Sequence, residues 1–142
     1  MIIGLAGGSP EDRQAVADSL QAIKNGPSLW AWSVESPLDT RAESLAAFLR
    51  GRRRQRRVRG QRPQGLLYTH VLLETEAQAL RDAGGVIWHV RGAPSRMVAN
   101  RHGDLQVTPE DDGAGHYLGP AEALSELLLS RRRGRGDASR KG

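Results

Sequence analysis

The sequence has no cysteine among its 142 residues and no long hydrophobic run. Without cysteine, disulfide bonds and metal sites built on thiolates are excluded. A transmembrane helix needs roughly 20 consecutive apolar residues, and no segment approaches that length. A secretory signal is not expected either, because no basic segment precedes an apolar one at the N-terminus. We therefore predict a cytoplasmic protein without a membrane partner.

Aromatic residues are also scarce, at 4% of the chain, and three of them are tryptophans. Trp30, Trp32 and Trp88 lie in apolar segments with strand character, so we expect at least two of them in the hydrophobic core. The histidines show no metal-ligand spacing, and we assign them structural roles. They are His70, His89, His102 and His116. We read the acidic pair at 111–112 as solvated, and we predict no metal site.

The net charge of +5 hides two oppositely charged parts of the chain. Residues 50–62, the arginine segment, contain eight of the 21 basic residues and no acidic residue. Residues 131–142 contain six basic residues and one aspartate, which leaves seven basic and fifteen acidic residues elsewhere. An acidic body with two basic segments favours a polyanionic partner, or basic segments that fold back on the body.

Hydrophobic patterns alternate between strand and helix character along most of the chain. The expected strands are 1–6, 29–34, 65–72, 86–90, 105–107 and 116–118, and the expected helices are 11–24, 38–49, 74–83 and 120–130. This alternation predicts one three-layer α/β domain over residues 1–130, with a mostly parallel sheet of about five strands and helices on both faces. We read residues 50–64 as a basic loop insertion or a helical extension. Residues 131–142 are expected to form a basic disordered tail.

The first strand is followed by a turn of small residues, Gly7, Gly8, Ser9 and Pro10. Strand, glycine turn and helix form the opening unit of phosphate-binding α/β domains, so Gly7, Gly8, Ser9 and Arg13 are candidate phosphate-binding residues. Ser9 is expected to cap the helix, with Pro10 as its first residue. A tight turn that only glycine allows also explains Gly7 and Gly8, and we favour that interpretation. Similarly, we favour Arg13 as an exposed residue of the first helical turn over Arg13 as a phosphate ligand.

Several short motifs occur in the order in which one enzyme family carries them. They are the start MIIGLAG, Val16-Ala17-Asp18 with Leu20, Ser36-Pro37-Leu38 with Ala46-Ala47-Phe48-Leu49, and Ala77-Gln78-Ala79-Leu80-Arg81 before Gly84-Gly85-Val86-Ile87-Trp88-His89-Val90-Arg91. In these motifs the chain resembles the (deoxy)nucleoside monophosphate kinases of phages and bacteria, a branch of the P-loop kinases. The resemblance spans nearly the whole chain, with a shortened middle. It implies a P-loop kinase fold, ATP and Mg²⁺ as cofactors, a nucleoside monophosphate as substrate, and the host cytoplasm for a phage-encoded protein.

The residues that this family's chemistry needs are missing. A working phosphate loop uses a glycine, a lysine for the β- and γ-phosphates and a Ser or Thr hydroxyl for Mg²⁺. In an alignment without a gap, these positions hold Asp12, Arg13 and Ala15. Glu11 and Asp12 would repel a polyphosphate, and Ala15 cannot hold a metal. After its third strand the family has an acid and an arginine; this chain has His70-Val71-Leu72, which offers a base but no arginine.

Two hypotheses about function follow. In the first, the protein is a diverged kinase-like pseudoenzyme with a degenerate Walker A motif and no cofactor, whose basic segments bind nucleic acid or an acidic protein. In the second, it is an active kinase that transfers the γ-phosphate of ATP to a (deoxy)nucleoside monophosphate, and Arg13, His70 and Arg91 are its candidate catalytic residues.

The candidate polyanion-binding residues are the eight arginines of the arginine segment. They are Arg50, Arg52, Arg53, Arg54, Arg56, Arg57, Arg59 and Arg62. Binding to phosphates would release counterions and would be independent of base sequence, because no base-reading element is visible. No aromatic residue interleaves these arginines, so the sequence does not predict a surface on which bases stack.

Overall fold

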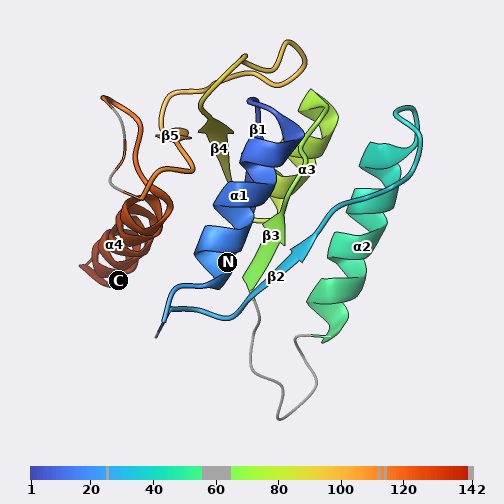
Figure 1. Ribbon diagram of the computed structural model, residues 1–142. Helices are drawn as coiled ribbons and strands as arrows, with labels where there is room; N and C mark the ends of the chain where they lie inside the picture. Colours follow the sequence, from blue (N-terminus) through green and yellow to red (C-terminus); the bar gives the residue numbers. More distant parts are fainter. Residues whose placement is uncertain (25, 56–64, 112, 114, 141–142) are drawn as a thin grey trace.

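The computed structural model describes the backbone of residues 1–24, 26–55, 65–111, 113 and 115–140, and the side chains of the same residues except 53–55 and 133–140. It has one sheet of five strands: β1 (Ile2–Ala6), β2 (Leu29–Trp32), β3 (Gly65–Tyr68), β4 (Val86–Val90) and β5 (Leu105–Val107). The strand order is β2-β3-β1-β4-β5 and every pairing is parallel (Figure 1). The α/β class and the parallel sheet of five strands predicted from the sequence are confirmed.

In the described part of the chain, four helices pack on the two faces of this sheet: α1 (Pro10–Gln21), α2 (Arg41–Gln55), α3 (Glu74–Asp82) and α4 (Pro120–Arg140). Residues of α1 and α4 share one apolar cluster with Ile3 and Leu5 of β1. Residues of α2 and α3 share a second cluster with Ile2 and Ala6 of the same strand. Because successive side chains of a strand point to opposite faces, α1 and α4 cover one face and α2 and α3 cover the other. All five residues of β1 are buried, as expected for the central strand of a covered parallel sheet.

The boundaries of α2 differ from the prediction at both ends. The helix begins at Arg41 rather than at Leu38, because Pro37 and Thr40 form a turn in which the Thr40 N–H donates to the Pro37 carbonyl at 3.0 Å. It continues to Gln55 rather than ending at Leu49, because arginine and glutamine favour helix even without an apolar stripe. The helical-extension interpretation is therefore correct for residues 50–55. Residues 56–64 lie outside the described residues.

Other boundaries also change. The strand predicted to reach Leu72 ends at Tyr68, because the Val71 N–H donates to Leu5 of β1 instead of continuing a strand ladder. Helix α1 ends at Gln21, three residues early. The segment predicted as a last strand makes one parallel bridge, between Val107 and Leu118. Helix α4 continues through Arg140, where we predicted a disordered tail from residue 131; the glycines there do not stop a helix rich in arginine.

No helix in the described part of the chain has both the length and the apolar character needed to cross a bilayer.

Candidate functional site

The carboxyl ends of β1 and β3 mark the place where neighbouring strands send the chain to opposite faces of the sheet. β1 leads into α1 on one face, and β3 leads into α3 on the other. In open parallel sheets, ligands bind at such a switch point. A cleft of about 660 Å³ opens here, and its lining includes Arg13, Trp32, Arg41 and His70. Of the three candidate catalytic residues, the fold brings Arg13 and His70 together in this cleft.

The turn after β1 has the shape that its glycines allow. Gly7 has φ +70° and Gly8 has φ +62°, both in the left-handed region that favours glycine. Ser9 caps α1 as predicted: its hydroxyl oxygen accepts the Asp12 N–H at 3.0 Å, and Pro10 is the first helical residue. The Gly8 N–H donates to the carbonyl of Ala93 at 2.9 Å. In an open phosphate loop this N–H would point at the bound anion. Here the Gly8 N–H is already bonded to another backbone group of the protein.

Arg13 fills the inside of the same turn. Its Nη1 donates to the carbonyl oxygens of Gly7 at 2.8 Å and Gly8 at 3.2 Å, and its Nε donates to Nδ1 of His70 at 3.0 Å. The residue is only 7% exposed, so its predicted exposed position is wrong. The cause is local. The side chain folds back over the end of β1, where backbone carbonyl oxygens accept its hydrogen bonds. Burial lowers the pKa of the Arg13 guanidinium, and the nearby carboxylate of Glu11 opposes that change.

His70 is held in one protonation state by this contact. An arginine nitrogen can only donate, so Nδ1 of His70 carries a lone pair and the proton of the neutral ring sits on Nε2. Burial lowers the pKa of the imidazole, and the positive charges of Arg13 and Arg41 lower it further. The only available lone pair of the neutral ring, on Nδ1, accepts the hydrogen bond from Arg13. The ring can therefore donate through Nε2 but is not placed to act as a general base. The predicted base role of His70 is therefore not supported by its geometry.

Arg41 reaches the same region from the start of α2, and sequence reasoning missed it. Its Nη2 donates to the carbonyl of His70 at 3.0 Å, and its Nε contacts Oε1 of Glu76 at 3.1 Å. Glu76 is fully buried and also accepts the Tyr68 hydroxyl and the backbone N–H groups of the two residues before α3. Burial raises the pKa of the Tyr68 hydroxyl, and its bond to Glu76 raises it further. The only sequence signal was a glutamate at the third position of a helix.

The side chain of Arg91, the third candidate catalytic residue, lies beside Glu110 and Tyr117 rather than beside Arg13 and His70. Arg91 follows β4, its Nη1 is 3.6 Å from Oε1 of Glu110, and its guanidinium lies 5.8 Å from the ring centre of Tyr117. Half of its side chain is exposed. The fold therefore does not bring the side chains of the three predicted catalytic residues together in one site.

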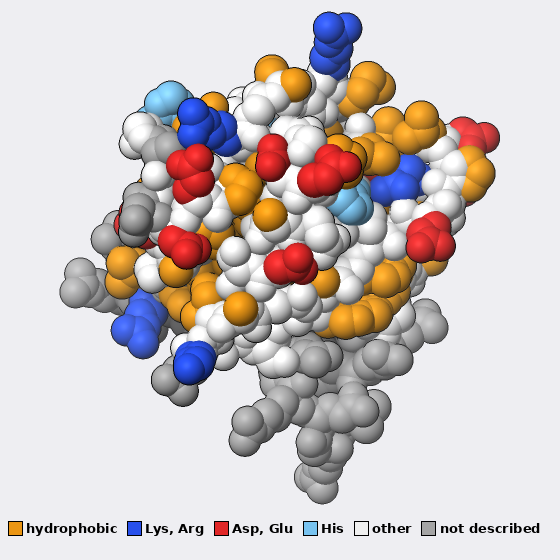
Figure 2. Space-filling model, in the orientation of Figure 1, with side chains coloured by type: hydrophobic (Ala, Val, Ile, Leu, Met, Phe, Trp, Pro, Cys, Tyr) orange, Lys and Arg blue, Asp and Glu red, His pale blue; other side chains and the backbone are white. Residues whose placement is uncertain are grey.

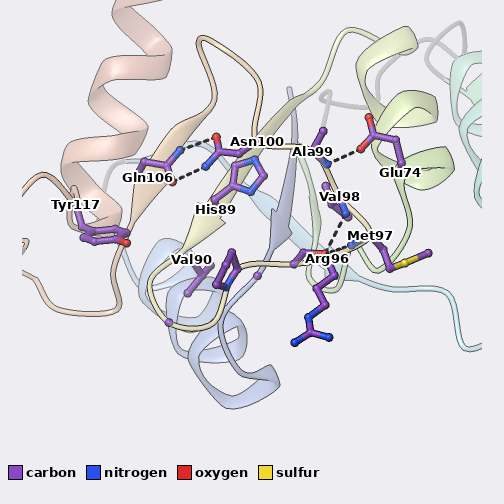
Figure 3. A pocket seen from close by; sticks show the side chains of 14 residues that line it. Glu74, His89, Val90, Arg96, Met97, Val98, Ala99, Asn100, Gln106 and Tyr117 are labelled. Carbon is purple, nitrogen blue, oxygen red and sulfur yellow. Dashed lines mark hydrogen bonds between the residues drawn. The ribbon is translucent and has the colours of Figure 1, made fainter.

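A second cavity of about 550 Å³ lies beside β4 and β5, under the segment 92–100 (Figure 3). Several of its polar side chains have hydrogen-bond partners within the protein. The amides of Asn100 and Gln106 exchange two hydrogen bonds of 2.9 Å each, and Nε2 of His89 lies 2.9 Å from Oδ2 of Asp104. Among the described residues, no cluster of three or more histidines and acids could hold a metal ion. The structural role predicted for His89 is consistent with its burial and its contact with Asp104.

The described start of the arginine segment, residues 50–55, lies at the opposite end of the sheet. Helix α2 runs back from the carboxyl end, and β3 begins with Gly65 at this same end (Figure 1). Arg50 is exposed and Arg52 is half-buried in the last turns of α2. Arg53 and Arg54 belong to the same helix, and the side chains of these two residues are not described. Arg56, Arg57, Arg59 and Arg62 lie outside the described residues.

The tryptophans divide as predicted between core and surface. Trp88 is 1% exposed in the cluster under α1 and α4, and Trp32 is partly buried against the cluster under α2 and α3. Trp30 is 43% exposed at the start of β2, with its ring centre 5.5 Å from that of Phe48 in α2. An aromatic side chain thus lies at the same end of the molecule as the last described turns of α2, where the arginine segment begins; the sequence pattern did not show this.

Comparison of the chain with protein-family models, with curated proteins and with solved structures found no significant match.

Proposed function

We propose that this protein is a diverged (deoxy)nucleoside monophosphate kinase-like protein that has lost phosphoryl transfer and binds nucleic acid or another polyanion through the arginine segment. The observation that carries the proposal is the position of Arg13. In a working phosphate loop, backbone N–H groups surround the anion and a lysine reaches it as a point charge. Here a guanidinium fills the turn and bonds to the carbonyls of Gly7 and Gly8.

The surroundings of the turn support the loss of catalysis. The Gly8 N–H is bonded to Ala93, and Ala15 offers no hydroxyl for Mg²⁺. Arg13 and Glu11 share the first turns of α1, so a polyphosphate bound at Arg13 would also meet the Glu11 carboxylate. Phosphoryl transfer depends almost entirely on positioning and charge stabilisation, and these groups supply little of either.

The distribution of charge supports polyanion binding at the other end of the sheet. On the face shown in Figure 2, acidic side chains are spread over the upper and middle parts of the molecule, in agreement with an acidic body. Eight arginines within 13 residues repel one another, and phosphates relieve that repulsion while releasing counterions. The proposed contact is with the backbone of the nucleic acid and is therefore independent of its base sequence.

Active kinase chemistry is the second candidate, and one observation favours it. The cleft of about 660 Å³ lies at the switch point of the sheet, where nucleotides bind in related architectures. Under this hypothesis Arg13 would leave the turn and contact the phosphates of ATP, with Mg²⁺ as cofactor and a nucleoside monophosphate as acceptor.

Calorimetric titration separates the two candidates. We expect no heat when ATP with Mg²⁺ is added to millimolar concentration, and a measurable heat of binding would favour the kinase. For polyanion binding, we expect the affinity for an oligonucleotide to fall steeply with salt. Replacement of all eight arginines of residues 50–62 by serine should abolish that dependence. A flat dependence in the unaltered protein would reject the arginine segment as the binding region.

Ancestry can be tested apart from activity. The triple variant Asp12→Gly, Arg13→Lys, Ala15→Thr restores the three missing phosphate-loop residues and removes the guanidinium from the turn. We expect it to bind ATP with Mg²⁺ at least tenfold more tightly than the parent protein, as measured by calorimetry. Arg13→Met alone is the matched control, since it opens the turn without supplying phosphate or metal ligands.

A further inference from the structure

The cleft at the switch point contains hydrogen-bonding groups that the protein itself does not use. Arg13 is 7% exposed; its Nε and Nη1 are bonded in and beside the turn, and the described residues supply no partner for its Nη2. Thr69 is 5% exposed, and its hydroxyl likewise has no hydrogen-bond partner in the described part of the chain. Neither atom is fully buried, and both residues line the cleft. Nη2 of Arg13 and the Thr69 hydroxyl are therefore open to a molecule bound there.

The charge of Arg13 is also left without a counter-charge. Arg41, the other arginine of the cleft, contacts Glu76 at 3.1 Å in a buried ion pair. Arg13 makes no ion pair within the described residues, and its bonded partners are an imidazole and two carbonyls. A buried cation without an anion is costly for a fold, and groups of this kind gather at binding sites. A ligand with a negative group at Nη2 would supply the missing charge.

The surroundings favour a ligand with one negative charge over a polyphosphate. The Gly8 N–H is bonded to Ala93 at 2.9 Å, so this backbone donor of the turn is not available to a large anion. The exposed Glu35 also lines the cleft, and its carboxylate would repel a multiply charged group more strongly than a singly charged one. A carboxylate has two oxygens, which can accept from Nη2 of Arg13 and from a second donor of the cleft. The Thr69 hydroxyl and Nε2 of His70 are such donors.

Other residues of the cleft provide an apolar wall with a fixed aromatic ring. Trp32, Val34 and Leu72 line it. The indole of Trp32 is stacked on Phe48 with 4.1 Å between the ring centres, and it meets the edge of Tyr68 at 5.8 Å. Because these rings already hold the indole, contact with a ligand costs little further side-chain entropy. The volume of about 660 Å³ is typical of sites that hold small organic molecules.

We propose that this cleft binds an aromatic monocarboxylic acid. Its carboxylate accepts hydrogen bonds from Nη2 of Arg13 and from the Thr69 hydroxyl, and its ring packs against Trp32. Binding leaves the bonds of Arg13 to Gly7 and Gly8 in place, so the turn does not have to open. The site is independent of the arginine segment and does not rest on the proposed polyanion binding.

Calorimetric titration of the full chain with naphthoate tests the proposal. Naphthamide has nearly the same shape without the charge, and we expect naphthoate to bind at least tenfold more tightly. Arg13→Met should abolish this preference, and Thr69→Val should weaken naphthoate binding by about fivefold. Trp32→Leu should weaken both ligands equally, because both lose the contact with the ring. Arg96→Met removes an exposed guanidinium outside the cleft, and this matched control should bind as the parent protein does.

Three results would overturn the proposal. They are the absence of naphthoate binding at millimolar concentration, equal binding of the two ligands by the parent protein, and an unchanged preference in Arg13→Met. Tighter binding of naphthyl phosphate than of naphthoate would also overturn it, in favour of a phosphate ligand. None of these results affects oligonucleotide binding, so failure of this site and failure of the proposed function are distinguishable. Thermal melting checks that each variant folds, and if Arg13→Met does not fold, Thr69→Val and Trp32→Leu carry the comparison.

Discussion

The two ends of the sheet use arginine in opposite ways. At the carboxyl end, Arg13 and Arg41 are buried, and their guanidinium groups donate to backbone carbonyls, to His70 and to Glu76. At the other end, Arg50 is exposed where the arginine segment begins. Arg41 and Glu76 form a buried pair that stabilises the structure only while both partners are present. An exposed guanidinium is available to a phosphate.

This contrast indicates at which end of the sheet phosphate can bind. The resemblance to kinases directs attention to the turn after β1, but its arginine is already bonded inside the protein. The other end of the sheet, which the resemblance does not emphasise, carries the exposed ring of Trp30 and the exposed side chain of Arg50. Substitutions in each of the two regions, with stability and oligonucleotide binding measured for both, test this contrast directly.

The largest effect is expected for Glu76→Gln. The substitution removes the charge that balances Arg41 and leaves a buried guanidinium uncompensated, so we expect the free energy of unfolding to fall by about 3 kcal/mol. Urea denaturation measures the change. Glu43→Gln, on the exposed side of α2, is the control and should change stability by less than about 0.5 kcal/mol. Equal effects of the two substitutions would show that the buried pair does not organise the carboxyl end.

A crossed pair of variants tests the comparison directly. Arg13→Met removes the bonds to Gly7, Gly8 and His70, and should lower the free energy of unfolding by about 1.5–3 kcal/mol while oligonucleotide affinity is unchanged. Arg50→Met should leave stability unchanged and reduce the slope of log affinity against log salt by about 0.7 for a single strand. Denaturation and anisotropy on both variants give the four values. Loss of oligonucleotide binding in Arg13→Met would mean that the turn itself meets phosphates.

A smaller effect separates a crowded glycine from an open one. Gly8 and Gly115 have nearly the same φ, +62° and +61°, so alanine introduces similar backbone strain at both. At Gly8 the added Cβ would also lie 2.9 Å from the Arg91 carbonyl, whereas at Gly115 nothing lies within 4 Å. We expect Gly8→Ala to be the more destabilising by about 1 kcal/mol in urea denaturation. Equal losses would indicate that the segment 91–95 does not press on the turn.

Much of the fold was predictable because it depends on local patterns. The run Val86–Val90 is apolar and β-branched, ends in a turn at Gly92, and forms β4 with the predicted bounds. The cap at Ser9 and the first residue Pro10 were predicted for the same reason, since a helix start is determined by neighbouring residues. The strand order and the end of β3 depend on contacts between distant segments, such as the bond from Val71 to Leu5, and no local pattern reports them.

The candidate site was less predictable than the fold. Arg13 and His70 are 57 residues apart, and Arg41 and Glu76 are 35 residues apart. The position of Arg13 after the turn favoured an exposed residue, because a long cationic side chain is rarely buried without partners. Its partners are backbone carbonyls, which carry no signature in the sequence. Trp30 and the start of the arginine segment are separate features of the sequence. The structure relates them through Phe48 of α2, whose ring centre lies 5.5 Å from that of Trp30.

The smallest effect concerns the pH dependence of stability at the contact of Arg13 with His70. An unfolded histidine has a pKa near 6.5. In the fold, burial and the charges of Arg13 and Arg41 lower the pKa of His70. Between these two values the unfolded chain binds the extra proton, so the free energy of unfolding falls as the pH decreases below about 6.5. Protonation at Nδ1 would also end the bond from Arg13 and bring two cations together. We expect His70→Gln, compared with the exposed His102→Gln, to flatten the change in urea midpoint between pH 7.5 and 5.5. An unaltered pH dependence in His70→Gln would mean that the position of Arg13 does not require a neutral imidazole. The carbonyl groups of Gly7 and Gly8 alone would then hold Arg13 in the turn.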